Sequence, residues 1–255
     1  MGILNVTPDS FSDGGKFSSA RSAIDHAVRM GDEGADIIDI GGESTRPGSD
    51  AVTSEEEIRR VVPVIEELVK KISVPISIDT YKSDVARAAL EAGARIVNDI
   101  SGFAFDGSMP SVAAMHKATA VLMHIQGTPK LMQQHPQYKN VTEEVKNFLE
   151  KQIGLARTAG VEQIIVDPGI GFGKTLAHNV TLFKELESFR SLGCPVLVGP
   201  SRKSFLGTLL DLPVEERVEG TAAAVAVSIL RGAHIVRVHD VQAMKRVAIV
   251  TDALR

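Results

Sequence analysis

Gly2-Ile-Leu-Asn-Val6 and Asp36-Ile-Ile-Asp-Ile40 are the first two of eight short apolar runs that decide the fold of this chain. The runs are rich in Ile and Val without regular polar alternation, which is typical of strands buried on both faces of a parallel sheet. Stretches with helical spacing separate them. The other six runs cover residues 75–79, 95–100, 120–124, 163–167, 195–199 and 234–238. This order predicts one α/β domain over residues 1–255, folded as a (β/α)8 TIM barrel.

The clearest predicted helix covers residues 54–72, where apolar residues recur at positions i, i+3 and i+4. Ser54 and Glu57 fit a capping box at its start. Pro63 lies inside the stretch, so we expect either a kink or a later start of the helix. A glycine ends four of the predicted helices, at positions 34, 93, 160 and 232, where it permits the left-handed turn that leads into the next strand.

The composition excludes several classes of protein. A net charge of −4 with mixed signs argues against a nucleic-acid binder, which would present a basic face. The single cysteine, Cys194, cannot form an intramolecular disulfide and fits a reducing cytoplasm, and no apolar run is long enough to span a membrane. The chain opens almost directly on its first predicted strand, so we expect the lower end of the barrel to be uncovered or covered by an upstream segment.

Polar side chains stand where the predicted strands end, and TIM barrels carry their sites at this edge. The acidic and amide groups, on four strands, are Asp39, Asp79, Asn98 and Asp167, whereas the basic groups, on the last two, are Arg202, Lys203, Arg237 and His239. This sorting predicts a pocket with an acidic side for the N–H groups of a heterocycle and a basic side for an anion such as diphosphate. Any single carboxylate could instead cap the following helix, but helix capping explains the whole ring poorly.

Two predicted loops on this face are unusually long. Residues 5–17 include Phe11, and residues 41–53 include Thr45, Arg46 and Pro47. Because both follow strand ends, we interpret them as lids that exclude water, with plain surface loops as the alternative.

A glycine-rich stretch, residues 167–175, does not match a P-loop, because Pro168 stands where the first glycine is required. We expect a turn there in which the glycines let the backbone approach a ligand. The histidines lack zinc-site spacing, whereas Asn5 and Asp39 are compatible with a magnesium ion shared with substrate phosphates.

Five stretches, residues 2–15, 39–48, 167–174, 201–204 and 237–239, together resemble the bacterial dihydropteroate synthase family, and the resemblance spans essentially the whole chain. It implies a homodimeric TIM-barrel transferase of folate biosynthesis, a target of sulfonamides. Such an enzyme joins 6-hydroxymethyl-7,8-dihydropterin diphosphate to p-aminobenzoate and releases diphosphate. The resemblance names these substrates, whereas the residues alone indicate only a heterocycle and an anion.

The resemblance also implies a role for each site residue. The catalytic group is Asp79, Lys203, Arg237 and His239. The pterin would be held among Asp39, Asp79, Asn98, Met123, Asp167, Lys203 and Arg237. The p-aminobenzoate would be surrounded by Phe11, Thr45, Arg46, Pro47, Lys203 and Ser204. Asn5 would contact Mg2+, and Arg237 and His239 the diphosphate.

The implied chemistry is an SN1-like substitution, in which diphosphate leaves first and cations stabilise the developing negative charge. A pterin-binding methyltransferase that uses methyltetrahydrofolate is the alternative enzyme, but it does not account for residues 201–204 or 45–47. A binding protein without activity is the alternative from another class, and the presence of Asn5, Lys203, Arg237 and His239 argues against it.

Overall fold

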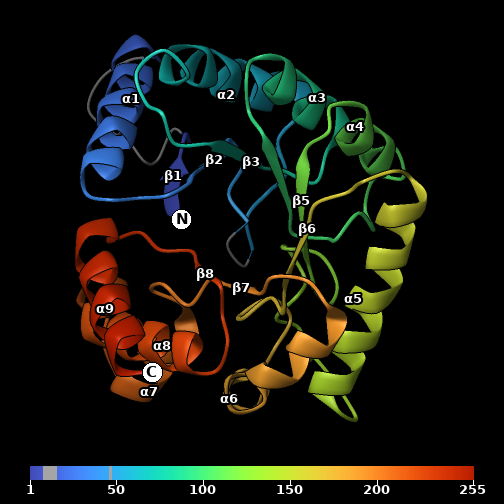
Figure 1. Ribbon diagram of the computed structural model, residues 1–255, viewed down its shortest axis with the longest axis vertical. Helices are drawn as coiled ribbons and strands as arrows, with labels where there is room; N and C mark the ends of the chain where they lie inside the picture. Colours follow the sequence, from blue (N-terminus) through green and yellow to red (C-terminus); the bar gives the residue numbers. More distant parts are fainter. Residues whose placement is uncertain (8–15, 46–47) are drawn as a thin grey trace.

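The computed structural model describes residues 1–7, 16–45 and 48–255, and in this part of the chain helices surround eight short parallel strands (Figure 1). Each strand overlaps one of the predicted runs, although the last two strands have only two residues each. The strands are β1 (Gly2–Asn5), β2 (Ile38–Gly41), β3 (Ile76–Asp79), β4 (Ile96–Asp99), β5 (Thr119–Met123), β6 (Ile164–Asp167), β7 (Leu197–Val198) and β8 (Ile235–Val236). The predicted α/β barrel architecture is confirmed.

Each strand is followed by at least one helix. The helices are α1 (Lys16–Asp32), α2 (Ser54–Leu68), α3 (Ser83–Glu91), α4 (Met109–Met115), α5 (Val141–Thr158), α6 (Leu176–Lys184), α7 (Ser204–Leu210), α8 (Val218–Leu230) and α9 (Val241–Leu254), with 3-10 turns η2 (Leu186–Leu192) and η3 (Val214–Glu216). Both α7 and α8 lie between β7 and β8. The four predicted helix-ending glycines, 34, 93, 160 and 232, all have positive φ, as expected for this turn. No helix within the described ranges is long and apolar enough to cross a membrane.

The strands form two parallel sheets, which are joined to each other by two isolated β-bridges. One parallel sheet runs in the order β1-β2-β3-β4-β5-β6, and a second pairs β7 with β8. A bridge between Gly2 and Val238 links β1 to the end of β8, and a bridge between Val166 and Val196 links β6 to the start of β7. These bridges connect the two sheets at both of their edges, with fewer backbone hydrogen bonds than within either sheet.

The inside of the barrel has an apolar lower layer directly beneath the polar upper layer. Met1, Ile96, Val121, Ile165 and Leu197 form a buried cluster there, against which Ile37 and Ile235 also pack. Side chains two residues apart on a strand point to the same face. The residues two positions further along these strands are Ile3, Asp39, Asn98, Met123, Asp167, Gly199 and Arg237. The pattern that fills the lower barrel thus aims five predicted site residues into its upper end, namely Asp39, Asn98, Met123, Asp167 and Arg237.

The structure corrects the predicted N-terminal cap of α2 and ends the helix at Leu68. Thr53 is the N-cap, and its hydroxyl accepts a hydrogen bond from the Glu56 N–H at 3.3 Å. The capping box of Ser54 and Glu57 is wrong, because the buried Glu57 side chain turns toward Lys82 instead. A later helix start is also wrong, since α2 begins at Ser54 and continues through Pro63.

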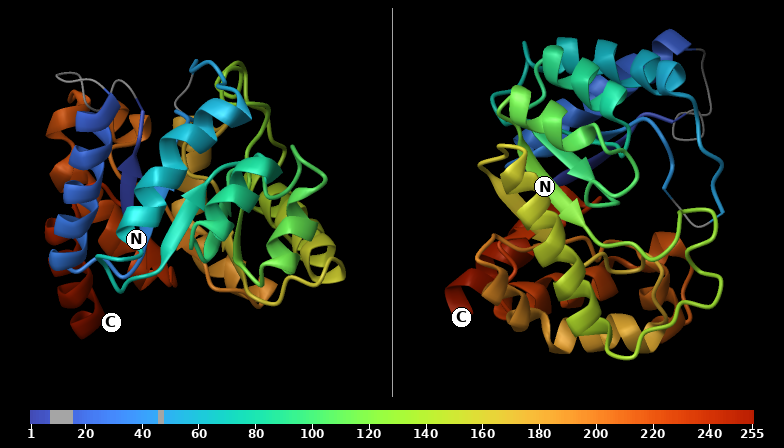
Figure 2. Two further views of the ribbon diagram at one scale, coloured as in Figure 1. Left: turned by 90° about the horizontal axis from the view of Figure 1, so that it is seen from above. Right: turned by 90° about the vertical axis from the view of Figure 1, so that its right-hand side faces the viewer.

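The lower end of the barrel contains a cavity of about 940 Å³, whose lining includes Met1, Asp36, His234 and Lys245. The opposite end carries the β2–α2 and β5–α5 segments, which project from the same side of the molecule (Figure 2). The Gly48 N–H donates to the Pro129 carbonyl at 3.3 Å, so these two segments are in contact. The polar ends of the strands lie beneath them.

One glycine inside α5 and one just after its end provide a matched test of the predicted turn geometry. Gly160 has φ +94°, whereas Gly154 lies within the helix with nothing near its missing Cβ. We expect Gly160→Ala to lower the free energy of unfolding by about 1–2 kcal/mol, because a Cβ is strained at positive φ. We expect Gly154→Ala to raise it by about 0.5–1 kcal/mol, because alanine favours helix. Urea unfolding of both variants measures this, and an equal effect of the two would contradict the assignment.

Candidate active site

Strand register lines up the upper rim of the site. Asn5 pairs with Gly41, Gly41 with Asp79, and Asp79 with Asn98, across four neighbouring strands. Met123 and Asp167 are paired in the same way on β5 and β6. Because parallel strands end at one edge, this register collects side chains that are far apart in the sequence into one ring.

Arg237 reaches across the barrel to two carboxylates. Its Nε donates to Asp39 Oδ2 at 2.6 Å and its Nη2 to Asp79 Oδ2 at 2.5 Å. Asn98 Nδ2 also donates to Asp39 Oδ2, at 3.0 Å. The predicted separation into an acidic and a basic side is therefore wrong for Arg237, which lies among the acids, because the barrel is narrow enough for a guanidinium to span it.

Two carboxylate oxygens beside this guanidinium are left unpaired. Asp39 Oδ1 and Asp79 Oδ1 are buried and have no hydrogen-bond partner among the described residues. A buried acceptor without a donor is costly, so its presence in a site indicates a place for a ligand N–H group.

The pocket between these side chains has a volume of only about 20 Å³. Its lining is Thr45, Asp79, Asn98, Ile100, Met123, Asp167, Ile170, Phe172, Gly199, Lys203 and Arg237. Seven of these were predicted site residues, and the apolar Ile100, Ile170 and Phe172 were missed. Because this volume is about that of a single water molecule, side chains must move before a two-ring ligand can enter.

Burial changes the ionisation of the pocket acids. Desolvation raises the pKa of Asp79 to about 7, although Arg237 opposes the shift, and it raises the pKa of Asp167 to about 6. Asp167 Oδ1 accepts from the Gly169 N–H at 2.7 Å, which partly offsets its burial. Burial thus disfavours the charged form of both acids, and the contacts already present offset only part of that cost.

The bases of the pocket are shifted in the opposite direction. Burial, with Arg237 nearby, lowers the pKa of Lys203 to about 8 and that of His239 to about 4. Burial alone would lower the pKa of Arg237, but Asp39 and Asp79 outweigh it and raise that pKa. Lys203 Nζ lies 3.9 Å from the centroid of the Phe172 ring, so the aromatic face holds this ammonium in place.

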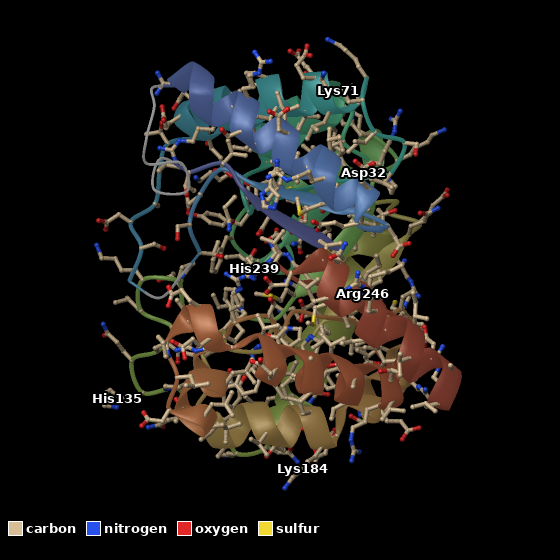
Figure 3. All side chains as sticks on the ribbon, turned by 90° about the vertical axis from the view of Figure 1, so that its left-hand side faces the viewer. Asp32, Lys71, His135, Lys184, His239 and Arg246 are labelled. Carbon is tan, nitrogen blue, oxygen red and sulfur yellow. The ribbon has the colours of Figure 1, made fainter. Side chains whose placement is uncertain are left out.

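His239 lies beside the pocket and not in its lining. Its Nδ1 is 3.0 Å from Ser201 Oγ, and the His239 N–H donates to the same hydroxyl at 3.2 Å. His239 is half-buried and lies toward the middle of the view in Figure 3, whereas Lys71 and Lys184 lie at the periphery. The serine fixes the orientation of the imidazole next to the Arg237 strand end.

Arg202 does not belong to the predicted anion-binding group. Its guanidinium makes two hydrogen bonds to Asp240, at 3.1 Å and 2.5 Å, and its φ is +57°. Its N–H donates to Thr221 Oγ1 at 3.1 Å. Arg202 therefore stabilises a strained turn that presents the next residue, Lys203, to the pocket.

The remaining predicted residues divide into three cases. Thr45 is half-buried and lines the pocket, whereas Ser204 is exposed at the start of α7 and does not. Asn5 is half-buried at the end of β1. Phe11, Arg46 and Pro47 lie outside the described residues.

Lys174 is a structural residue that the sequence did not reveal. It is buried, and its Nζ contacts the carbonyls of Gly169 and Phe172 at 2.9 Å and His124 Nδ1 at 3.0 Å. A Cβ at Gly169 would overlap the His124 carbonyl. Gly169 thus permits close approach to the neighbouring strand end, whereas Gly171 lies against the Lys203 side chain, and approach to a ligand stays a prediction.

Comparison with known proteins agrees with this geometry. The model of the family "pterin binding enzyme" matches residues 1–239. The dihydropteroate synthase of Synechocystis is 54% identical over 257 residues, which are 100% of this chain and 89% of that protein. A crystal structure of the Clostridium difficile dihydropteroate synthase in the presence of pteroic acid has a TM-score of 0.95 and 47% identity, covering 100% of this chain and 95% of that one. The Yersinia pestis enzyme in complex with a sulfonamide drug has a TM-score of 0.94 and 44% identity, covering 100% and 93%.

The chain belongs to the pterin-binding enzyme family, and within that family to the dihydropteroate synthases. Its activity is that of a transferase.

The raised pKa of Asp167 predicts how stability depends on pH. The folded protein keeps a proton on Asp167 up to about pH 6, whereas the unfolded chain releases it near pH 3.8, so this group costs stability as the pH rises through that window. Asp167→Asn removes the cost. We expect the free energy of unfolding of the variant, relative to wild type, to rise by on the order of 1–3 kcal/mol between pH 4 and pH 7. Urea unfolding at both pH values measures it, and a difference that stays constant would show that burial does not raise this pKa.

Proposed function

We propose that the pocket binds 6-hydroxymethyl-7,8-dihydropterin diphosphate and joins its pterin methylene carbon to p-aminobenzoate, with release of diphosphate. The observation that carries this proposal is the buried pair Asp39 and Asp79, each with an unpaired oxygen, beside the cations Arg237 and Lys203. A pterin offers the amino and ring N–H groups that such oxygens accept, and diphosphate offers the negative charge that the cations require.

Arg237 has to change partners when substrate binds. Its guanidinium spans the space between Asp39 and Asp79 in a pocket of about 20 Å³, so a pterin ring needs it to move. We propose that the pterin N–H groups take over the carboxylates while Arg237 turns toward the diphosphate near His239. This exchange replaces one pair of charge-assisted hydrogen bonds by another, so neither carboxylate is left without a donor.

The C–O bond to diphosphate breaks first, and its electron pair leaves with the diphosphate. Arg237 and Lys203 stabilise this growing negative charge, and the carboxylates of Asp79 and Asp167 stabilise the positive charge that spreads into the pterin ring. His239, whose pKa is lowered to about 4, is neutral near pH 7 and acts as a hydrogen-bond donor to the leaving group. The neutral aniline nitrogen then attacks the carbon. The acidic ammonium group that results gives its proton to water or to the released diphosphate, so no strong base is needed.

The second substrate would occupy the mouth of the pocket. Thr45 lines this mouth, and Lys203 and Phe172 stand beside it. The sulfonamide complex of the Yersinia pestis relative supports the same site as a sulfonamide target in this chain. Phe11, Pro47 and Arg46 would complete the enclosure and exclude water from the cation.

A magnesium ion is the proposed cofactor. Asn5 offers an amide oxygen that faces Gly41 opposite Asp79, since a Cβ at Gly41 would lie 3.9 Å from Asn5 Oδ1 and 3.7 Å from Asp79 Oδ2. The described residues contain no group of three acids or histidines that could form a protein cage for a metal. Such a sparse donor set fits magnesium, which keeps several waters and takes substrate phosphates. Asn5, aided by Asp39, would hold the ion, which when bound adds positive charge to the leaving diphosphate.

The test is an assay of purified protein with dihydropterin diphosphate, p-aminobenzoate and magnesium, in which diphosphate and 7,8-dihydropteroate are followed together. We expect equal amounts of both products, loss of both with a chelator, and a decrease in kcat of about 100-fold or more in Lys203→Met, because a preorganised cation is removed. Lys184→Met is the matched control, since this lysine lies on the outer surface. Binding of a pterin without either product would favour the methyltransferase or the binding protein.

We propose further that the protein acts as a homodimer in the cytoplasm. Cys194 is a buried free thiol, which suits a reducing cytoplasm. The last three helices carry several exposed apolar side chains, namely Leu209, Leu210, Val227, Leu230, Ile249, Val250 and Leu254. Such residues suit an interface between copies. Light scattering at micromolar concentration should give twice the mass of one chain, and a monomer at every concentration would overturn this assignment.

A further inference from the structure

Lys82 forms a buried cluster of contacts that the reaction described above does not use. Its Nζ donates to Glu43 Oε2 at 2.5 Å, to Glu57 Oε2 at 2.7 Å and to the Val52 carbonyl at 2.7 Å. The side chains of Glu43 and Glu57 are 6% and 1% exposed, and that of Lys82 is 16% exposed. The ion pairs are therefore largely shielded from solvent, unlike the surface pairs of this protein, and removal of one partner would leave an uncompensated charge.

The contacts join the two ends of the long β2–α2 loop. Glu43 stands just after β2 and Val52 just before α2, and the Val52 N–H also donates to Glu43 Oε2 at 2.9 Å. One ammonium and one carboxylate thus hold Glu43 and Val52 together, and we call these two residues the loop base. Thr45, which lines the pocket, lies two residues from this base.

The same contacts attach the loop base to the site. Lys82 is three residues beyond Asp79, the last residue of β3, and it is the N-cap of α3. Next to it, the Tyr81 hydroxyl donates to Glu43 Oε1 at 2.5 Å, and the Tyr81 ring packs edge-on against Phe105, with centroids 5.5 Å apart. Tyr81 and Lys82 therefore hold Glu43 close to the end of the strand that carries Asp79.

We infer that Lys82 is a positioning residue for the second substrate, because it holds both ends of residues 43–52 against the Asp79 strand and so sets where Thr45 stands at the pocket mouth. The inference rests on the proposed function. The positioning role predicts that loss of Lys82 weakens the binding of p-aminobenzoate and not that of the pterin. The pterin lies among Asp79, Asn98 and Asp167, which other elements hold, whereas the p-aminobenzoate depends on the loop that Lys82 anchors.

The test compares Lys82→Met with Lys82→Arg in steady-state assays and in calorimetry. We expect Lys82→Met to raise the KM for p-aminobenzoate about tenfold or more, because a small displacement of a positioned group is costly. The Kd for dihydropterin diphosphate should change less than about twofold, because no pterin contact is lost. Lys82→Arg should recover most of the loss, because a guanidinium can engage Glu43 and Glu57 together.

Hydrogen exchange tests the positioning role of Lys82 without any turnover of substrate. Hydrogen exchange of residues 43–53 should accelerate about tenfold in Lys82→Met while exchange in α5 stays unchanged, because only the loop base is released. Lys71→Met is the matched control, since this exposed lysine follows α2 on the outer surface. If Lys82→Met fails to fold, Glu43→Gln carries the test, because it keeps an acceptor for the Val52 N–H but removes the charge.

The outcomes separate this inference from the proposed function. An unchanged KM for p-aminobenzoate, or an equal loss of affinity for both substrates, would overturn the positioning role of Lys82. Wild-type protein that turns over neither substrate would instead overturn the proposed function itself. Selective loss in Lys82→Met with recovery in Lys82→Arg would establish the role.

Discussion

The ion pairs of Arg237 with Asp39 and Asp79 are the interaction on which the rest of the site depends. They connect the end of β8 to β2 and β3 through the barrel, next to the joint where a single bridge links β8 to β1. Removing one partner of a buried pair costs about 3–5 kcal/mol, because the other charge is left without compensation. The pairs also leave one oxygen of each acid unsatisfied, so the arrangement is complete only when a ligand supplies further donors.

The apolar layer below the site makes this possible. Val121 and Leu197 are fully buried, and with their neighbours they close the barrel beneath the polar ring. Water is thereby excluded from one side of Asp79 and Asp167, which raises the pKa of both. The desolvation that lowers the stability of the free protein is the same property that strengthens each electrostatic contact with the substrate.

One buried and one half-buried lysine stabilise the loops around the pocket, and the sequence signalled neither. Lys174 binds backbone carbonyls within the β6–α6 loop, and Lys82 binds the base of the β2–α2 loop. A lysine in a polar stretch is usually exposed, so only its neighbours in space reveal that it is buried. The error on Arg202 has the same origin, because its partner Asp240 is 38 residues away in the sequence.

By itself, the sequence determined the barrel, because runs of Ile and Val with helical stretches between them have few other ways to bury their apolar surface. It also determined which residues point into the barrel, because side chains two residues apart on a strand share a face. Asp39, Asp167 and Arg237 therefore point to the same side as the apolar Ile37, Ile165 and Ile235. The tertiary structure alone decided which of these side chains touch one another. Strand register, the narrow diameter of the barrel and the burial of charge placed Arg237 between two acids, and contacts of this range cannot be read from local spacing.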